Sequence, residues 1–258
     1  AAMYEQTVLV ERNGPVTTVV IRRPEKRNAV DEPTASALRE AFLAFDADDE
    51  ASVAVLTGAG SDFCAGADLA RVAEGMRYEP EGVGPMGPTR LLLTKPVIAA
   101  VEGHAVAGGL ELAIWCDLRV ASADAIFGVF CRRWDVPLVD GGTVRLPRLI
   151  GHGRALDMIL TGRPVDAQEA LSFGLVDRIV APGTARAAAE KLARGIARFP
   201  QACVRAGPMS AHRQWGQDIA GALRFEGRGG EPVIREEASR GAARFAAGHG
   251  RGGDFESI

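Results

Sequence analysis

Two glycine-containing segments have the residue types needed to stabilise negative charge on a carbonyl oxygen. The segments GAGSDFCAGADL (58–69) and GHAVAGGLELAIWCD (103–117) each follow a short apolar run and lead into a helical pattern. Backbone N–H groups in the first turn of a helix have no intrahelical acceptor, and two of them directed at one point form an oxyanion hole. Gly108 and Gly109 would keep such a site open to a substrate, or they would only allow close packing of a helix on a sheet.

Glu111 is a single carboxylate in an otherwise apolar stretch, one helical turn after these glycines. A lone glutamate in a helix usually faces solvent, but the neighbours here are Leu110 and the run LAIW (112–115), which do not describe a solvated face. A carboxylate held in a cavity beside an oxyanion hole can take up and release protons during a reaction. We therefore expect Glu111 to be a general acid/base.

The elements that must position these residues alternate between strands and helices in the first half of the chain. The runs TVLVER (7–12) and VTTVVIRR (16–23) flank Asn13-Gly14 and predict a hairpin. Asp31 is placed to cap a helix that runs to about Phe45. Three short apolar runs predict buried strands: 52–58, 96–103 and 117–122. This order predicts an α/β fold with sites at the strand ends, followed by a mostly helical part after about residue 150.

Composition excludes several classes of protein. The 258 residues are 47% hydrophobic, which allows one large domain or a domain with a smaller helical annex. The net charge is −3 with both signs interspersed, so we expect no nucleic-acid partner. The four cysteines follow no metal-binding or disulfide spacing, so we expect no metal site and a reducing compartment. No run of 18 apolar residues and no signal-peptide pattern occurs, which predicts a cytoplasmic protein that does not enter a membrane.

The segments FCAGADL (63–69) and GHAVAGGLELAIWCDLRVA (103–121) together resemble the crotonase superfamily, the enoyl-CoA hydratase/isomerase family. Further segments that resemble this family lie in the family's order along the chain, one before these two at 23–31 and two after them at 140–151 and 160–180. The resemblance implies a crotonase-like α/β fold of repeated ββα units with a helical C-terminal trimerisation region. It also implies a catalytic core over 1–200, a helical region and tail over 201–258, and a homotrimer or a hexamer.

The resemblance further implies that the substrate is an acyl thioester of coenzyme A, with no separate cofactor. The N–H groups of Ala67 and Gly108 would form the oxyanion hole, and Glu111 would lie near the Cα–Cβ bond of a bound enoyl group. Contacts to coenzyme A would come from residues in two segments: Lys26, Arg27, Ala29, Ala65, Asp68 and Leu69. For Lys26 and Arg27 the alternative is an ordinary solvated surface pair.

The sequence departs from the family pattern where two-glutamate hydratases have their second carboxylate. Ungapped counting from Phe127 places Cys131 there, at a position that contacts substrate in the family. A thiol is a poor replacement, because its pKa is high and burial raises it further. Three explanations stay open. Glu111 could act alone, Asp135 or Asp140 could supply the second carboxyl, or the reaction could be one other than hydration.

The residues near Cys131 and the oxyanion loop could also have structural roles and take no part in catalysis. Asp140 could be an N-cap of the helix that follows it, and Asp135 could pair with Arg132 or Arg133. His104 is expected to support the oxyanion loop by packing or by a backbone hydrogen bond. Because no histidine lies near Cys131 in the sequence, we do not expect it to be a nucleophile.

These observations predict an enoyl-CoA hydratase, a lyase of fatty acid metabolism that adds water across the 2,3 double bond. One alternative is an enoyl-CoA isomerase, although single-glutamate isomerases of the family usually carry their base at the position of Cys131. The other is an acyl-CoA-binding homologue with little turnover. The sequence does not predict the acyl chain length.

Overall fold

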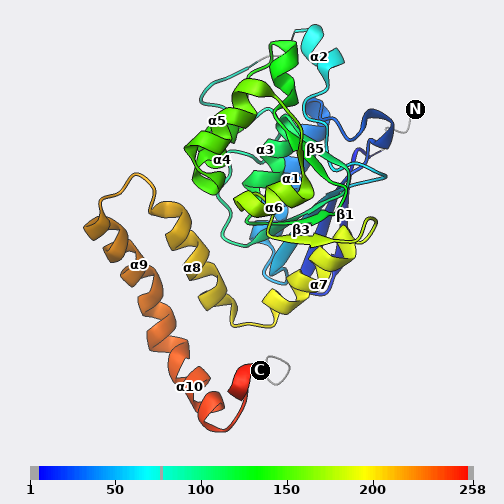
Figure 1. Ribbon diagram of the computed structural model, residues 1–258. Helices are drawn as coiled ribbons and strands as arrows, with labels where there is room; N and C mark the ends of the chain where they lie inside the picture. Colours follow the sequence, from blue (N-terminus) through cyan, green and yellow to red (C-terminus); the bar gives the residue numbers. More distant parts are fainter. Residues whose placement is uncertain (1–5, 76–77, 255–258) are drawn as a thin grey trace.

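The computed structural model describes residues 6–75 and 78–254 and contains two β-sheets flanked by helices (Figure 1). The larger sheet has six strands in the order β1-β2-β3-β4-β6-β9, and the smaller has the order β5-β7-β8. The strands of the larger sheet are β1 (Val8–Asn13), β2 (Val16–Ile21), β3 (Val53–Gly58), β4 (Val97–Val101), β6 (Leu118–Ser122) and β9 (Arg178–Val180). Those of the smaller sheet are β5 (His104–Val106), β7 (Ile126–Gly128) and β8 (Val165–Asp166).

The predicted ββα repeat is confirmed. Three times the chain forms two strands and then a helix, as β1-β2-α1 (Glu32–Ala47), β4-β5-α3 (Gly108–Trp115) and β6-β7-α4 (Gly142–Ile150). In the second and third repeats the first strand joins the larger sheet and the second strand joins the smaller one. The sequence did not reveal this division, because β5 and β7 have only three residues each and no periodicity of their own.

The first hairpin and helix form as the sequence predicts. β1 and β2 pair in antiparallel fashion around Asn13-Gly14, and Gly14 has the positive φ that this turn needs. The Asp31 side chain accepts a hydrogen bond from the Thr34 N–H (3.0 Å) and caps α1, which buries Leu38 and Phe42. From β2 onward the neighbouring strands of the larger sheet are parallel.

Helices cover both faces of the larger sheet. On one face α7 (Ala185–Ala197) packs through Ala185, Ala189 and Ala193, whose small side chains let the helix approach the strands closely. On the other face α1 and α3 contribute to the main hydrophobic core. The remaining helices of the main body are α2 (Leu69–Ala73), α5 (His152–Thr161) and α6 (Ala167–Phe173), with the 3-10 turns η1 (Pro24–Lys26) and η2 (Phe130–Trp134).

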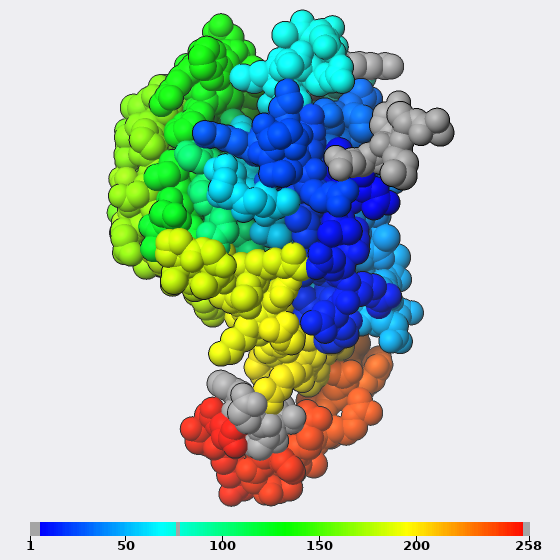
Figure 2. Space-filling view, turned by 90° about the vertical axis from the view of Figure 1, so that its right-hand side faces the viewer, coloured from blue at the N-terminus to red at the C-terminus, as the bar shows by residue number. Residues whose placement is uncertain are grey.

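The last helices extend away from this body. α8 (Gln201–Arg213) and α9 (Ile219–Val233) form an antiparallel pair, and α10 (Ser239–Ala246) follows after the π-helical segment η3 (Ile234–Ala238) (Figure 1). A short turn, η4 (Arg251–Gly253), comes last. Figure 2 shows this part as a narrower lobe below the main body. No helix among residues 6–75 and 78–254 has the length and apolar character that crossing a membrane requires.

Candidate active site

The two glycine-containing segments lie side by side, as the oxyanion-hole hypothesis requires. Cys64 forms an isolated bridge with Ala105 of β5, and the Cys64 N–H donates to the carbonyl of His104 (2.9 Å). Gly66 has a φ of +99°, and a side chain there could not fit, because its Cβ would lie 2.9 Å from the Gly108 nitrogen. The residue after Gly66 is therefore held close to the start of α3.

Gly109 fits the explanation by close helix packing, whereas Gly108 fits the explanation by an open site. A Cβ on Gly109 would lie 2.0 Å from the carbonyl oxygen of Cys64, so this glycine permits close packing of α3 on the first segment. A Cβ on Gly108 would instead meet the side chain of Met86, 2.6 Å from its sulfur. Met86 and Gly108 both line a cavity of about 260 Å³, so the absence of a side chain at Gly108 keeps this cavity open.

The N–H groups of Ala67 and Gly108 are available to a ligand. Both residues line the cavity, and neither N–H donates to an acceptor in the described part of the chain. Ala107 turns the chain sharply from β5 into α3 with a φ of 54° and a ψ of −125°, a conformation that is strained for a residue with a side chain. The positive end of the α3 dipole adds to the attraction of an anion at this point.

Eight of the predicted site residues line this one cavity: Arg27, Ala65, Ala67, Leu69, Gly108, Glu111, Cys131 and Asp140. Three others do not. Lys26 is exposed at the end of η1, and Ala29 is buried in the core. Asp68 is buried as the N-cap of α2, and its carboxylate forms an ion pair with Arg23 (2.9 Å). These three side chains do not line the cavity, so the cavity does not provide their predicted contacts with coenzyme A.

Glu111 is 2% exposed and its carboxylate is not left without partners. Its Oε1 accepts hydrogen bonds from the N–H groups of Asp140 (2.9 Å) and Gly142 (2.8 Å). A Cβ on Gly142 would lie 2.8 Å from the same oxygen, which explains the glycine at the start of α4. Burial, and then the charge of Asp140, raise the pKa of Glu111 to about 7. At neutral pH the group can therefore both accept and release a proton.

The N-cap explanation of Asp140 is wrong. α4 begins at Gly142 after Gly141, and no side chain caps it. Gly141 has a φ of 92°, and the Asp140 side chain points instead to the segment before β4, where Oδ1 accepts from Met86 N–H (3.0 Å) and from the Thr89 hydroxyl (2.5 Å). Burial raises the pKa of Asp140. Asp140 is thus a second carboxyl group at the wall of the cavity.

Cys131 and Asp135 have different surroundings, although both belong to the η2 region. Cys131 is buried, and burial followed by the nearby charge of Glu111 raises the pKa of its thiol to about 11. Asp135 is exposed and does not line the cavity. It forms no ion pair with Arg132 or Arg133 in the described structure, so the pairing explanation is wrong. Arg133 instead lies over the Phe130 ring, 4.8 Å from its centroid.

His104 supports the first segment in the way expected, but through a partner that sequence reasoning missed. Asp62 Oδ1 accepts from the His104 N–H (3.0 Å) and lies 2.7 Å from Nδ1 of its ring. Burial alone would raise the pKa of Asp62, but the hydrogen bonds from the His104 side chain and backbone together hold it below its usual value. No local signal distinguishes Asp62 from other acidic loop residues.

The cavity offers no metal site that the structure records. Among the described residues, no group of three or more His, Cys, Asp or Glu side chains is arranged to hold a metal ion. The groups that line the cavity include the carboxyl groups of Glu111 and Asp140, the thiol of Cys131, the side chains of Arg27 and His104, and the residues Ala67 and Gly108 with their free N–H groups.

Comparison with known proteins shows which family the chain resembles over most of its length. The family model described as enoyl-CoA hydratase/isomerase matches residues 11–246. A short-chain-enoyl-CoA hydratase from Clostridium acetobutylicum is 38% identical over 229 residues, which are 87% of this chain and 88% of that protein. A carnitinyl-CoA dehydratase from Salmonella arizonae is 40% identical over 196 residues, 74% of each chain. The crystal structure of enoyl-CoA hydratase EchA1 from Mycobacterium marinum superposes with a TM-score of 0.89 at 36% identity, covering 94% of this chain and 96% of that one.

Proposed function

The chain belongs to the enoyl-CoA hydratase/isomerase family, and we propose that it adds water across the 2,3 double bond of an enoyl-CoA thioester, with Glu111 as general acid/base. One observation carries the proposal. Glu111, with a pKa of about 7, lines the same cavity as the free N–H groups of Ala67 and Gly108. The family relatives named as hydratases support the reaction class, and the cavity supports the roles of the residues.

In the proposed reaction the thioester carbonyl oxygen accepts hydrogen bonds from Ala67 and Gly108. These bonds stabilise the enolate that forms when the oxygen of water adds to Cβ. Glu111 takes the proton from that water and returns it to Cα, so that the carboxylate is restored at the end of each turnover. Asp140 accepts a hydrogen bond from the attacking water through Oδ2, which neither Met86 nor Thr89 uses. Arg27, Ala65 and Leu69 contact coenzyme A, which is part of the substrate.

An assay of two substrates tests this function. Purified protein should remove the absorbance of crotonyl-CoA and should convert a 3-enoyl-CoA slowly or not at all. Faster conversion of the 3-enoyl-CoA would instead indicate an isomerase. If calorimetry detects binding of an acyl-CoA but neither reaction occurs, the protein is a binding homologue.

The proposed role of Glu111 predicts one ascending limb in the pH profile of hydration. Glu111 must be ionised to accept the proton, and its pKa is raised to about 7, so the rate should rise as the pH passes from 6 to 8. The measurement is kcat/KM for crotonyl-CoA between pH 5.5 and 9. A rate that is already constant above pH 5.5 would contradict the assignment.

Asp140→Asn is expected to lower crotonyl-CoA hydration by about 10-fold to 100-fold, because the cavity loses the carboxylate that orients the water. The amide keeps an oxygen that can accept from Met86 and Thr89, so the fold should stay intact. Loss of the negative charge should also move the ascending limb to lower pH. Adding Cys131→Glu should restore part of the rate, because it returns a second carboxyl group to the cavity. Unchanged hydration by Asp140→Asn would show that Glu111 acts without it.

We also propose that the C-terminal helices bind other copies of the chain, as a homotrimer or a hexamer, and that residues 201–258 form a region distinct from the core. Large apolar side chains on these helices are exposed in the single chain, including Ile219, Leu223, Ile234 and Phe245. A soluble monomer rarely exposes so much apolar surface in one region. Light scattering measures the mass of the assembly directly.

We also propose that the protein is located in the cytoplasm. All four cysteines are free thiols in the structure, and three of them, Cys64, Cys116 and Cys131, are buried. This is the state that a reducing compartment maintains. Fractionation of the cells that produce the protein would test it.

A further inference from the structure

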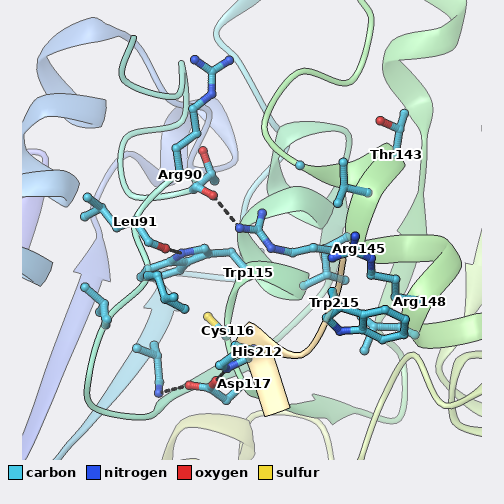
Figure 3. Close-up of a pocket in the computed structure, with 18 of the residues that line it drawn as sticks. Arg90, Leu91, Trp115, Cys116, Asp117, Thr143, Arg145, Arg148, His212 and Trp215 are labelled. Carbon is cyan, nitrogen blue, oxygen red and sulfur yellow. Dashed lines mark hydrogen bonds and ion pairs between the residues drawn. The ribbon is translucent and has the colours of Figure 1, made fainter. Parts of the chain in front are cut away.

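A second cavity lies beside the 140–142 turn, whose N–H groups donate to Glu111. It has a volume of about 620 Å³ and lies between α4, the segment 89–97 and α8 (Figure 3). Glu111 is not among its lining residues, but Arg145 and Arg148 of α4 both point into it. Arg148 lies over the ring of Trp215, 4.7 Å from the ring centroid. The two arginines are one turn apart on the same helix and have different partners.

The Arg145 guanidinium joins the two segments that surround the carboxyl pair. Its Nη2 donates to the carbonyl of Thr89 (2.7 Å) and its Nη1 to the carbonyl of Asp140 (3.1 Å). Thr89 in turn donates its hydroxyl to the Asp140 carboxylate, and the Asp140 N–H donates to Glu111. Arg145 therefore closes a ring of hydrogen bonds around the turn 140–142.

Gly141 leaves the space that the Arg145 guanidinium needs to reach the Asp140 carbonyl. A Cβ at Gly141 would lie 2.1 Å from Nη1 of Arg145, so any other residue would displace the guanidinium from the Asp140 carbonyl. At the start of α4, Gly142 leaves space for the Glu111 carboxyl group, and Gly141 just before the helix leaves space for Arg145. The two glycines thus allow Glu111 and Arg145 to contact the same turn.

The positive charge of Arg145 is not neutralised by an ion pair. In the part of the chain that the structure describes, no carboxylate lies within ion-pair distance of its guanidinium. The acidic groups that it influences are Glu111, Asp140 and the thiol of Cys116. Because the Arg145 side chain is half-buried, its charge acts on the carboxyl pair with less screening than a fully exposed charge would.

We propose that Arg145 is a positioning residue for Glu111, which holds the 140–142 turn against the 86–89 segment and places a positive charge behind the two carboxyl groups. This inference rests on the proposed function and deepens it. The guanidinium does not line the substrate cavity, so it acts through the turn and through its electric field. Its charge favours the ionised form of Glu111, the form that accepts a proton from water.

Several charged and titratable groups around Glu111 raise or lower its pKa or the pKa of a neighbouring group. Asp140 raises the pKa of Glu111, whereas Arg145 and the N–H groups of Gly142 and Asp140 lower it. Glu111 in turn raises the pKa of Cys131, whose thiol stays protonated near neutral pH. Arg90 lowers the pKa of Asp140 and donates to the carbonyl of Val139 (3.2 Å). Asp140 has the larger effect of the two charges on the pKa of Glu111, and removal of Arg145 would take away the opposing positive charge.

The test compares Arg145→Gln with Arg148→Gln in the full chain. The titration of Glu111 is followed by difference infrared spectroscopy of its carboxyl band, identified by its loss in Glu111→Gln. This measurement does not depend on turnover, so it remains decisive if the protein is not a hydratase. We expect Arg145→Gln to raise the midpoint of Glu111 by about one pH unit and Arg148→Gln to leave it unchanged. An unchanged midpoint in Arg145→Gln, or equal shifts in both variants, would overturn the proposal.

Kinetics provide a second readout. In Arg145→Gln the ascending limb of crotonyl-CoA hydration should move to higher pH, opposite to its movement in Asp140→Asn. Arg145→Lys keeps the charge but can reach only one of the two carbonyls. Its midpoint should stay near native while the plateau rate falls about 3-fold to 10-fold. If Arg145→Gln does not fold, Arg145→Lys carries the test, and a native plateau in that variant would overturn the proposal.

Discussion

Glu111→Gln is expected to reduce crotonyl-CoA hydration by about 10²-fold to 10⁴-fold, the usual effect of removing a general acid/base. Glutamine keeps an oxygen that can accept from the N–H groups of Asp140 and Gly142, so the turn before α4 should keep its shape. What it loses is the ability to accept a proton. The measurement is kcat at pH 8, where the native carboxylate is ionised.

Two controls make this result specific to proton transfer. Circular dichroism should show a native fold, and calorimetry with butyryl-CoA, which has no double bond to hydrate, should show near-native affinity. A folded Glu111→Gln protein that retains most of its hydration would remove Glu111 from the mechanism. Loss of binding together with rate would show that the residue shapes the cavity instead.

Gly108→Val is expected to lower both acyl-CoA binding and hydration, with hydration falling by about 10²-fold or more. The new side chain would force Met86 to move within the cavity, since its Cβ would lie only 2.6 Å from the Met86 sulfur. Valine would also stand beside the N–H group that is proposed to bind the thioester oxygen. The measurements are kcat/KM for crotonyl-CoA and the dissociation constant of butyryl-CoA.

Gly195→Val is the matched control for this substitution. Gly195 lies in α7, and a Cβ there would have open space around it. The control should therefore bind and turn over substrate like the native protein, at a small cost in helix propensity. Native affinity for butyryl-CoA in Gly108→Val would exclude Gly108 from the binding site.

The features that the sequence predicted correctly depend on local patterns. Of the strands in the larger sheet, β1, β2, β3, β4 and β6 lie on the runs that predicted them, whereas β9 was not predicted. The cap of α1 needs only Asp31 and the Thr34 N–H three residues on. The burial of Glu111 followed from the apolar residues around it. In each case the neighbours in sequence are also the neighbours that decide the structure.

The features that the sequence did not predict depend on contacts between distant segments. Asp140 has the position of an N-cap in the sequence, but its carboxylate is bound by Met86 and Thr89, more than fifty residues earlier. Arg145 reaches the Thr89 carbonyl over a similar separation. Asp68 is drawn to Arg23, 45 residues earlier, and so away from the cavity. No periodicity or spacing within one segment contains this information.

The thiol of Cys131 raises a problem of self-inactivation that its surroundings solve. An enoyl thioester is an electrophile at Cβ, and a thiolate beside it would add there just as water does, with a proton passing to Cα. The product would be a thioether that leaves the protein alkylated by its own proposed substrate. Because the pKa of Cys131 is raised to about 11, only roughly one molecule in 10⁴ carries the reactive thiolate at pH 7. Burial and the neighbouring Glu111 charge, which suppress this thiolate, would therefore let a cysteine line a cavity whose proposed substrate is a Michael acceptor.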